Sequence, residues 1–144
     1  MELARLIEAL SDAAAYPYPV GAVDVRHTHI SVVFLAGVFA YKVKKPVNLG
    51  FLDFSTLDKR RNFCGEEVRL NRRLAPEVYL GVVPLTLAAT GVQVEGRGEA
   101  IEWAVKMNRL PDEATLQERL RHGQVGIELL KALARNVASF HARA

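Results

Sequence analysis

A lysine and a glutamate that both fall among apolar residues are the first candidates for chemistry. Alternation along the strand predicted over residues 38–45 puts Lys42 on the same face as Ala40. Glu67 lies within an apolar stripe of the long helix predicted over residues 56–75. A buried ammonium and a buried carboxylate are each costly without a partner, so these two side chains could pair with each other.

Plainer interpretations of both residues stay open. Lys42 could extend along the strand and reach solvent with its ammonium group. Glu67, which lies on the stripe of Phe63, Leu70 and Leu74, could sit at the edge of that stripe and stay hydrated. A strand lysine followed by a helix glutamate is nevertheless the pair that orients phosphates in kinases. We therefore predict an ion pair between the two side chains at an anion-binding groove.

A second strand lysine, Lys106, is the main rival for this role. The run WAVK at residues 103–106 is closer to the V-A-I-K strand of kinases than residues 39–42 are. Three glycines between residues 91 and 98 precede it and could imitate a phosphate-binding loop. Irregularly spaced glycines are, however, typical of hairpin turns, and few residues remain after Lys106 for a glutamate-bearing helix. We therefore expect Lys106 to be an exposed strand residue.

Polar side chains gather where the first predicted strand, residues 30–35, begins. Thr28 and Ser31 could offer hydroxyl and backbone N–H groups to phosphate oxygens, or could simply shape the entry to the strand. His27 and His29 flank Thr28, and two histidines at this spacing could bind a metal ion. No third ligand lies nearby in the sequence, so we predict no metal site.

The predicted long helix carries a cluster of basic side chains, which are Lys59, Arg60, Arg61, Arg69, Arg72 and Arg73. Such a cluster is usually a solvated helix face, although it could contact nucleic acid. The net charge of +3 is too small to favour nucleic acid as the partner. Cys64 lies on the same helix, and its lone thiol is typical of packing rather than of reaction.

Helices at both ends and strands between them would have to position these side chains. We predict helices over residues 2–14, 56–75, 110–123 and 126–142, and strands over residues 30–35, 38–45, 79–87, 92–94 and 101–107. This order predicts an α+β fold in which one long helix crosses an antiparallel sheet of about five strands, like the small lobe of a kinase. The last helix is predicted to bury a stripe made of Leu130, Leu133, Val137 and Phe140.

Composition excludes several classes of protein. The chain has 144 residues, of which 50% are hydrophobic and 24% charged, the balance of one ordinary globular domain rather than of a disordered chain. A single cysteine leaves no internal disulfide, and no apolar run reaches the roughly 18 residues of a membrane span. The N-terminus has an early acidic residue and no long apolar core, unlike a signal peptide, so we expect a cytoplasmic protein.

Several segments together carry a family resemblance. They are HTHISVVFL at 27–35, AYKVKKP at 40–46, GFLDFSTL at 50–57, LNRRLAP at 70–76, YLGVVP at 79–84, AVKM at 104–107 and FHARA at 140–144. These segments resemble aminoglycoside phosphotransferase-like proteins, which have a protein-kinase-like fold, and in particular a bacterial group often joined to a P-loop ATPase domain. One departure is His27, where that family usually has an acidic residue.

The resemblance implies roles for individual residues. Lys42 matches the phosphate-contacting lysine, and Glu67 matches the helix glutamate. Met107, Asn108 and Arg109 match the segment that joins the two lobes, where an adenine would dock. The full nucleotide-binding set that the resemblance implies is Lys42, Glu67, Ala40, Thr28, Ser31, Met107 and Arg109, with ATP and Mg²⁺ as the cofactors.

The resemblance also implies a division of the chain. Residues 1–109 would form the kinase-like N-terminal lobe, and residues 110–144 would form the truncated start of the helical lobe. No H-x-D-x-x-x-x-N run and no suitably placed D-F-G-like run occurs, so we expect no catalytic loop, no metal ligands and no activity of the chain alone.

The function expected on this basis is that of the ATP-binding lobe of a small-molecule phosphotransferase. The alternative is a non-catalytic module that uses the same groove to bind a nucleotide or a partner. The expected partners are a nucleotide and either a missing C-terminal lobe or a second copy of the chain. A nucleic-acid binder that uses the arginine-rich helix is a further, less favoured alternative, and no membrane partner is expected.

Overall fold

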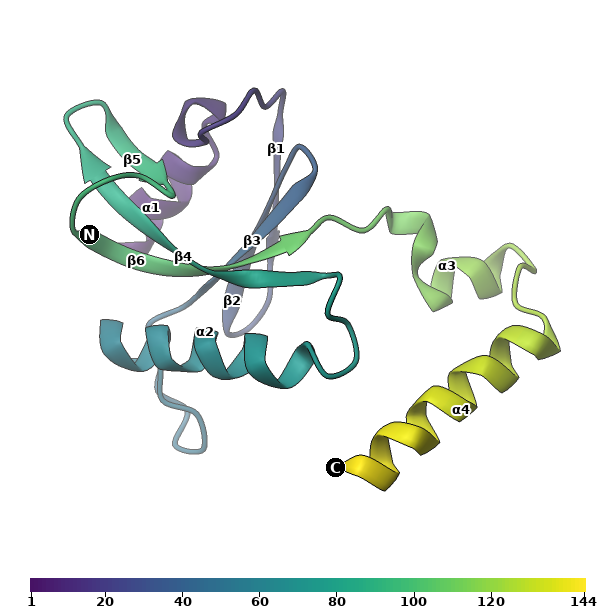
Figure 1. Cartoon of the computed structure of the whole chain (residues 1–144). Coiled ribbons are helices and arrows are strands. Elements are labelled where there is room, and N and C mark those ends of the chain that lie inside the picture. The colour runs from purple at the N-terminus through teal and green to yellow at the C-terminus, as the bar shows by residue number, and fades with distance from the viewer. The chain divides into compact units, whose positions relative to one another are not determined.

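Six antiparallel strands form a single sheet in the computed structural model, which describes all 144 residues (Figure 1). The strands are β1 (Val23–His27), β2 (Ser31–Ala36), β3 (Phe39–Lys44), β4 (Tyr79–Ala88), β5 (Gly91–Val94) and β6 (Ala100–Asn108). Their order in the sheet is β1-β2-β3-β6-β4-β5, so β3 lies between β2 and β6. The predicted α+β class is confirmed, with six strands in place of about five.

The strand that the prediction lacked is β1, which ends at His27, before the first predicted strand at residues 30–35. It pairs with β2 from Val23, opposite Ala36, to His27, opposite Val32. β1 is an edge strand in which only Val23 and Val25 are half-buried. An edge strand needs little apolar surface, and two valines give too weak a hydrophobic signal to reveal it in the sequence.

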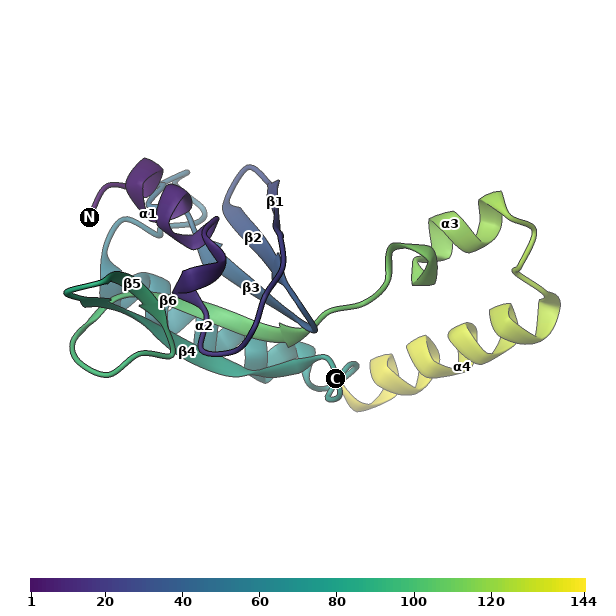
Figure 2. The ribbon, with the colours of Figure 1, turned by 90° about the horizontal axis from the view of Figure 1, so that it is seen from above.

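The N-terminal segment covers one face of the sheet (Figures 1 and 2). This segment contains α1 (Leu3–Leu10) and the short 3-10 helix η1 (Ala13–Ala15). Leu6 and Leu10 of α1 are buried in one cluster with Phe34 of β2, Tyr41 of β3 and Leu85 of β4. This cluster is the main hydrophobic core, and it leaves the opposite face of the sheet for a second layer.

The helix α2 (Leu57–Asn71) forms that second layer (Figure 1). It begins after Thr56, whose hydroxyl accepts a hydrogen bond from a backbone N–H of the first turn at 3.3 Å. Cys64 and Val68 are buried against Val105 of β6. This is the long crossing helix that the sequence predicts.

The buried face of α2 is not the stripe that the sequence predicted. Phe63, Leu70 and Leu74 are 39%, 38% and 56% exposed. The side of the helix that packs on the sheet carries Cys64 and Glu67 instead. A carboxylate can turn toward the sheet there because lysines on the neighbouring strand neutralise it. Charge pairing therefore helps to set the rotation of α2 about its own axis.

The chain divides into two compact units, Met1–Arg109, which holds the sheet, and Leu110–Ala144. The second unit contains η2 (Asp112–Ala114), α3 (Leu116–Arg121) and α4 (Ile127–Arg143). The stripe of α4 that was predicted to be buried is largely exposed: Leu130, Leu133 and Val137 are 47%, 44% and 41% exposed, and only Phe140 is half-buried. A unit made only of these helical segments has no second layer to enclose the stripe.

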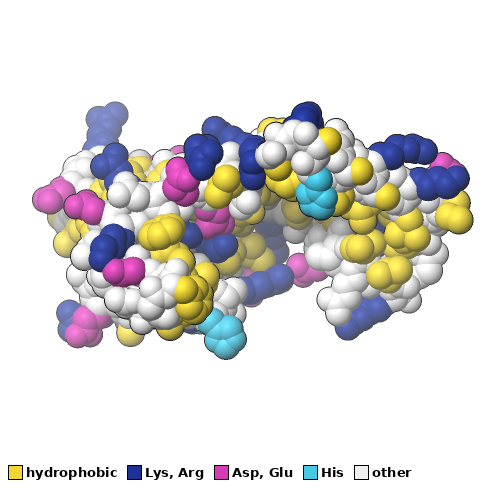
Figure 3. Space-filling view, turned by 90° about the horizontal axis from the view of Figure 1, so that it is seen from below, with side chains coloured by type: hydrophobic (Ala, Val, Ile, Leu, Met, Phe, Trp, Pro, Cys, Tyr) yellow, Lys and Arg dark blue, Asp and Glu magenta, His cyan; other side chains and the backbone are white.

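Hydrophobic side chains accordingly gather on the surface of the second unit, as the yellow atoms of Figure 3 show over α3 and α4. None of the helices in either unit combines the length and the apolar composition that crossing a membrane requires.

Candidate functional site

Two lysines of β3 share one glutamate of α2. The Nζ atom of Lys42 lies 2.9 Å from Oε1 of Glu67, and the Nζ atom of Lys44 lies 2.7 Å from Oε2. The lysines are two residues apart on an extended strand, so both point to the face that α2 covers. The predicted ion pair between Lys42 and Glu67 is confirmed, and Lys44 is a third member that the sequence did not single out. We call these three residues the charged trio.

The members of the charged trio differ in their contact with solvent. The side chain of Lys44 is 5% exposed, that of Glu67 is 13% exposed and that of Lys42 is 28% exposed. The ring of Phe54 lies 4.9 Å from the Lys44 ammonium. Lys42 donates one hydrogen bond, to Glu67, of the three that an ammonium group can donate. An anion from solvent could therefore reach Lys42, whereas Lys44 is enclosed.

The carboxylate of the trio is ionised at neutral pH. Burial alone would raise the pKa of Glu67, but the hydrogen bonds and charges of Lys44 and Lys42 outweigh burial and hold that pKa below its usual value. Two ammonium groups and one carboxylate leave the trio with an excess of one positive charge. The exposed end of that positive charge is Lys42.

A second buried ion pair fixes α2 to the sheet. Nε of Arg60 lies 2.9 Å from Oε2 of Glu102 in β6, and the guanidinium also donates to the Phe54 carbonyl at 2.9 Å. Burial raises the pKa of Glu102, against the hydrogen bond from the Trp103 N–H and the charge of Arg60. This pair could not be predicted from the sequence, because Arg60 belongs to a run of basic residues that is typical of a solvated helix face.

Cys64 has the packing role that its sequence position predicts. The residue is fully buried, and its burial raises the pKa of the thiol to about 11. The thiol is therefore protonated at neutral pH and is not a nucleophile.

Ala40 and Met107 extend the face on which Lys42 lies. They are opposite each other in the β3–β6 pair, and both lie on the α2 side of the sheet. Met107 is half-buried and packs against the cluster around Cys64. Arg109 follows β6 as an exposed residue, and its N–H donates to the Val38 carbonyl at 2.9 Å. Lys42 therefore has an apolar neighbourhood on the same face.

The backbone of Ser31 is hydrogen-bonded to Thr28. The Thr28 hydroxyl accepts a hydrogen bond from the Ser31 N–H at 3.0 Å, and the Thr28 N–H donates to the Ser31 carbonyl at 2.9 Å. Ser31 is fully buried, and its hydroxyl has no partner. It lies directly opposite Lys44 in the β2–β3 pair. The structure thus places Ser31 beside the enclosed lysine of the trio and places Thr28 in the β1–β2 turn.

Lys106, the rival lysine, lies on the other face of the sheet. It is opposite Tyr41, whereas Lys42 is opposite Val105. The Nζ atom of Lys106 contacts both carboxylate oxygens of Glu95, at 3.0 and 2.8 Å, and lies 4.3 Å from the centre of the Phe39 ring. This lysine is only 18% exposed, so it is not the exposed strand residue that was expected. Its charge is cancelled by one carboxylate of its own.

The basic side chains of α2 and of the two residues that follow it contact partners within the protein. Their contacts are Lys59 with Asp53, Arg60 with Glu102, Arg61 with the Trp103 ring, Arg69 with Glu66, Arg72 with the Tyr79 and Leu80 carbonyls, and Arg73 with the Leu70 carbonyl. Each of these positive charges therefore has a partner within the protein. His27 and His29 belong to no cluster of three or more side chains that could hold a metal ion.

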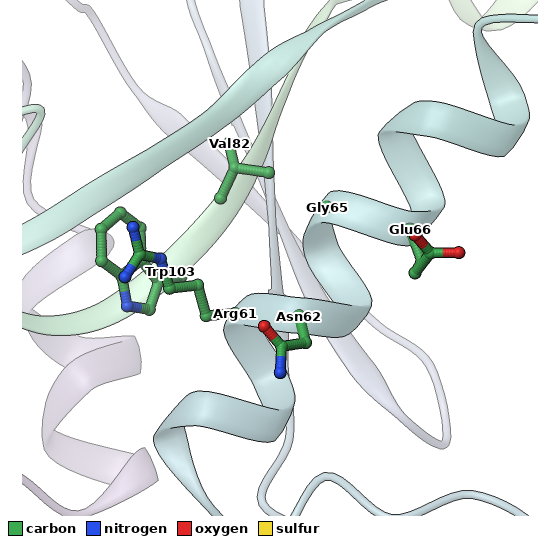
Figure 4. Close-up of a pocket in the computed structure, with 6 residues that line it drawn as sticks. All are labelled: Arg61, Asn62, Gly65, Glu66, Val82 and Trp103. Atoms are coloured by element: carbon green, nitrogen blue, oxygen red, sulfur yellow. The ribbon is translucent and has the colours of Figure 1, made fainter.

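A hollow of about 550 Å³ lies beside α2 and includes none of the predicted site residues (Figure 4). It is lined by Arg61, Asn62, Gly65 and Glu66 of α2 and by Val82 and Trp103 of the sheet. Arg61 lies over the Trp103 ring, with 4.2 Å between the guanidinium carbon and the ring centre. Glu66 points away from the ring in Figure 4. The hollow is open to solvent, and its lining combines one basic, one acidic, one amide and two apolar side chains without an excess of charge. The charged trio therefore remains the better candidate site for an anion.

Comparison with known proteins gives relatives without an assigned activity. Proteins of Mycobacterium tuberculosis and Mycobacterium bovis that are described as uncharacterized are 39% identical over 122 residues, which is 85% of this chain. The matched part is 23% of those proteins, so the chain spans about a quarter of the length of the curated relatives it matches. No family model and no solved structure matches the chain.

Proposed function

We propose that Met1–Arg109 is a nucleotide-binding lobe of the kind found in aminoglycoside phosphotransferase-like proteins, and that Lys42 binds the phosphates of ATP. The observation that carries the proposal is the ion pair of 2.9 Å between Lys42 on a central strand and Glu67 on the helix that crosses it. A strand lysine held by a helix glutamate is the arrangement that orients phosphates in kinases.

The surroundings of Lys42 suit a phosphate group. Its ammonium has donors left over after its one hydrogen bond to Glu67, and it keeps 28% of its side-chain surface in solvent. Glu67 holds the ammonium in place, so little side-chain entropy remains to be lost when a phosphate binds. A charge-assisted hydrogen bond from Lys42 to a phosphate oxygen would then anchor the ligand.

The apolar part of the same face suits a nucleobase. Ala40 and Met107 are cross-strand neighbours there, and Arg109 leads the chain away from the sheet. In the proposed complex, the adenine lies near Met107 and the phosphates lie at Lys42. Mg²⁺ is assigned to no residue of this chain, because the resemblance matches none of its residues to a metal ligand.

The whole protein's reaction is proposed to be phosphoryl transfer to a small molecule, for which this lobe supplies ATP. A phosphotransferase also needs a base and metal ligands. The alternative, a module that binds a nucleotide without catalysis, makes the same prediction for Lys42 and differs only in whether turnover occurs.

Titration with ATP tests the proposal. We expect the chain to bind ATP with a dissociation constant of about 1 mM, which corresponds to about −4 kcal/mol. Lys42→Met removes a charge-assisted contact of about 1.5–3 kcal/mol and should weaken ATP binding at least roughly tenfold. Amide chemical shifts in NMR spectra report both the affinity and the residues affected.

Lys106→Met is the matched control, because it removes a lysine of the same sheet from the opposite face. It should leave the ATP affinity within about twofold of the wild-type value. The proposal fails if Lys42→Met binds ATP as the wild-type protein does, or if ATP shifts only residues 91–106.

A further inference from the structure

We infer that Lys44 is a positioning residue of the proposed phosphate site: it neutralises Glu67 and thereby leaves the positive charge of Lys42 available to a phosphate. This inference rests on the proposed function and assigns a role to a buried residue within it. Lys44 lies 2.7 Å from Glu67 and is 5% exposed, so it acts through Glu67 and does not touch the ligand itself.

The geometry of the carboxylate separates the two lysines. Lys44 donates a hydrogen bond to Oε2 of Glu67, while Lys42 donates one to Oε1. Because each lysine has an oxygen of its own, both can stay bound to Glu67 at once. A phosphate that approaches from solvent meets Lys42 first, since Lys44 lies under the Phe54 ring.

Counting charges shows what Lys44 adds. With Lys44, the trio carries an excess of one positive charge; without it, Lys42 and Glu67 would form a neutral pair. In a partly buried site the screening by water is weak, so a neutral pair attracts a phosphate far less than a charged trio does. A lysine–glutamate pair alone can orient a phosphate but brings no net positive charge to it, whereas the trio adds one.

The opposite face of the sheet provides an internal comparison. There Lys106 contacts both oxygens of Glu95, and no second lysine shares that carboxylate. This pair is neutral and serves to cover the Phe39 ring. The difference between the two faces is the extra lysine, which makes one of them suitable for an anion.

The test compares ATP with adenosine, which lacks phosphates, in NMR titrations of four proteins: the wild-type chain, Lys42→Met, Lys44→Met, and the double variant Lys44→Met with Glu67→Gln. We expect Lys44→Met to weaken ATP binding at least tenfold, and to leave adenosine binding within twofold of wild type. The double variant removes one positive and one negative charge, so the site regains its excess positive charge. We expect this double variant to bind ATP at least threefold more tightly than Lys44→Met does, while staying weaker than wild type because glutamine holds the Lys42 ammonium less firmly than Glu67 does.

Each outcome separates this inference from the proposed function. If Lys42→Met weakens ATP binding and Lys44→Met does not, Lys44 has no such role but the phosphate site stands. If neither lysine matters, the proposed function fails as well. If Lys44→Met weakens binding and the double variant does not recover it, Lys44 acts through packing, which overturns the inference. Should Lys44→Met not fold, Lys44→Gln replaces it in the same comparison, because glutamine also removes the positive charge but can still donate a hydrogen bond to Glu67.

Discussion

Replacing Glu67 by glutamine should destabilise the Met1–Arg109 unit more than replacing Lys42 by methionine. Glu67→Gln removes the carboxylate that two lysines share, and it leaves Lys44 charged with a side chain that is only 5% exposed. Breaking a buried ion pair by removing one partner costs about 3–5 kcal/mol, and we expect a value near the lower end because Lys42 can still reach solvent. Lys42→Met leaves Glu67 paired with Lys44, so its cost should stay below about 1 kcal/mol.

Urea unfolding can measure this difference through the fluorescence of Trp103. It is the single tryptophan of the chain, and Arg61 of α2 covers its ring at 4.2 Å. Its emission therefore reports the separation of α2 from the sheet. With a dependence on urea of about 1.5–2 kcal/mol per M, a loss of about 3 kcal/mol lowers the midpoint by about 1.5–2 M.

A specific result would refute the reasoning about the shared carboxylate. If Glu67→Gln lowers the urea midpoint no more than Lys42→Met does, then the buried Lys44 ammonium does not need the Glu67 carboxylate as its counter-ion. A far-ultraviolet circular dichroism spectrum of each variant before unfolding controls for loss of the fold. Lys106→Met, from the opposite face, gives a matched reference for removing a partly buried lysine whose partner is Glu95.

Three further predictions concern neighbouring groups. The pKa of Glu67 is lowered in the folded state, so its ionised form stabilises the fold above the unfolded pKa of about 4.3. That stabilisation is lost as the pH falls through the lower folded pKa. The difference in unfolding free energy between wild type and Glu67→Gln should therefore shrink below about pH 4.3. Arg60→Met should cost about 3 kcal/mol or more in urea unfolding because it leaves Glu102 buried without its cation, and adding Glu102→Gln should recover part of the loss. Ser31→Ala should change the unfolding free energy by less than about 1 kcal/mol or raise it, because the hydroxyl that it removes is buried without a partner; a loss above about 2 kcal/mol would contradict this.

The ion pair between Lys42 and Glu67 could be predicted from the sequence for a physical reason. Lys42 lies among apolar residues of its strand and Glu67 turns toward the sheet, so burial obliges each to find a counter-ion, although the apolar stripe that served to place Glu67 is itself exposed. The role of Lys44 could not be predicted in the same way. Alternation places it on the face of Lys42, but only the tertiary packing, in which the Phe54 ring lies 4.9 Å from the Lys44 ammonium, leaves Lys44 enclosed while Lys42 keeps its contact with solvent.

In the fold, too, features set by local sequence patterns were predicted and features set by tertiary contacts were not. The central strands and α2 have clear apolar or capping patterns, and the sequence predicts them. β1 lies at the sheet edge with two half-buried valines, so its pattern is weak. The rotation of α2 was predicted wrongly because hydrophobicity pointed to Phe63 and Leu70, while the buried side is set by Cys64 and by paired charges in contact with β3 and β6.

The most direct measurement of the central claim is an NMR titration of the lysine ammonium nitrogens with ATP, in protein labelled with ¹⁵N-lysine. The account predicts that the Lys42 signal shifts most as ATP binds. The Lys106 signal should stay unchanged, because the Lys106 ammonium is paired with both carboxylate oxygens of Glu95. Adenosine, which carries no phosphate, should leave the Lys42 signal nearly unchanged. A shift of Lys106 without one of Lys42, or no shift of either at saturating ATP, would contradict the assignment of Lys42 as the phosphate-binding lysine.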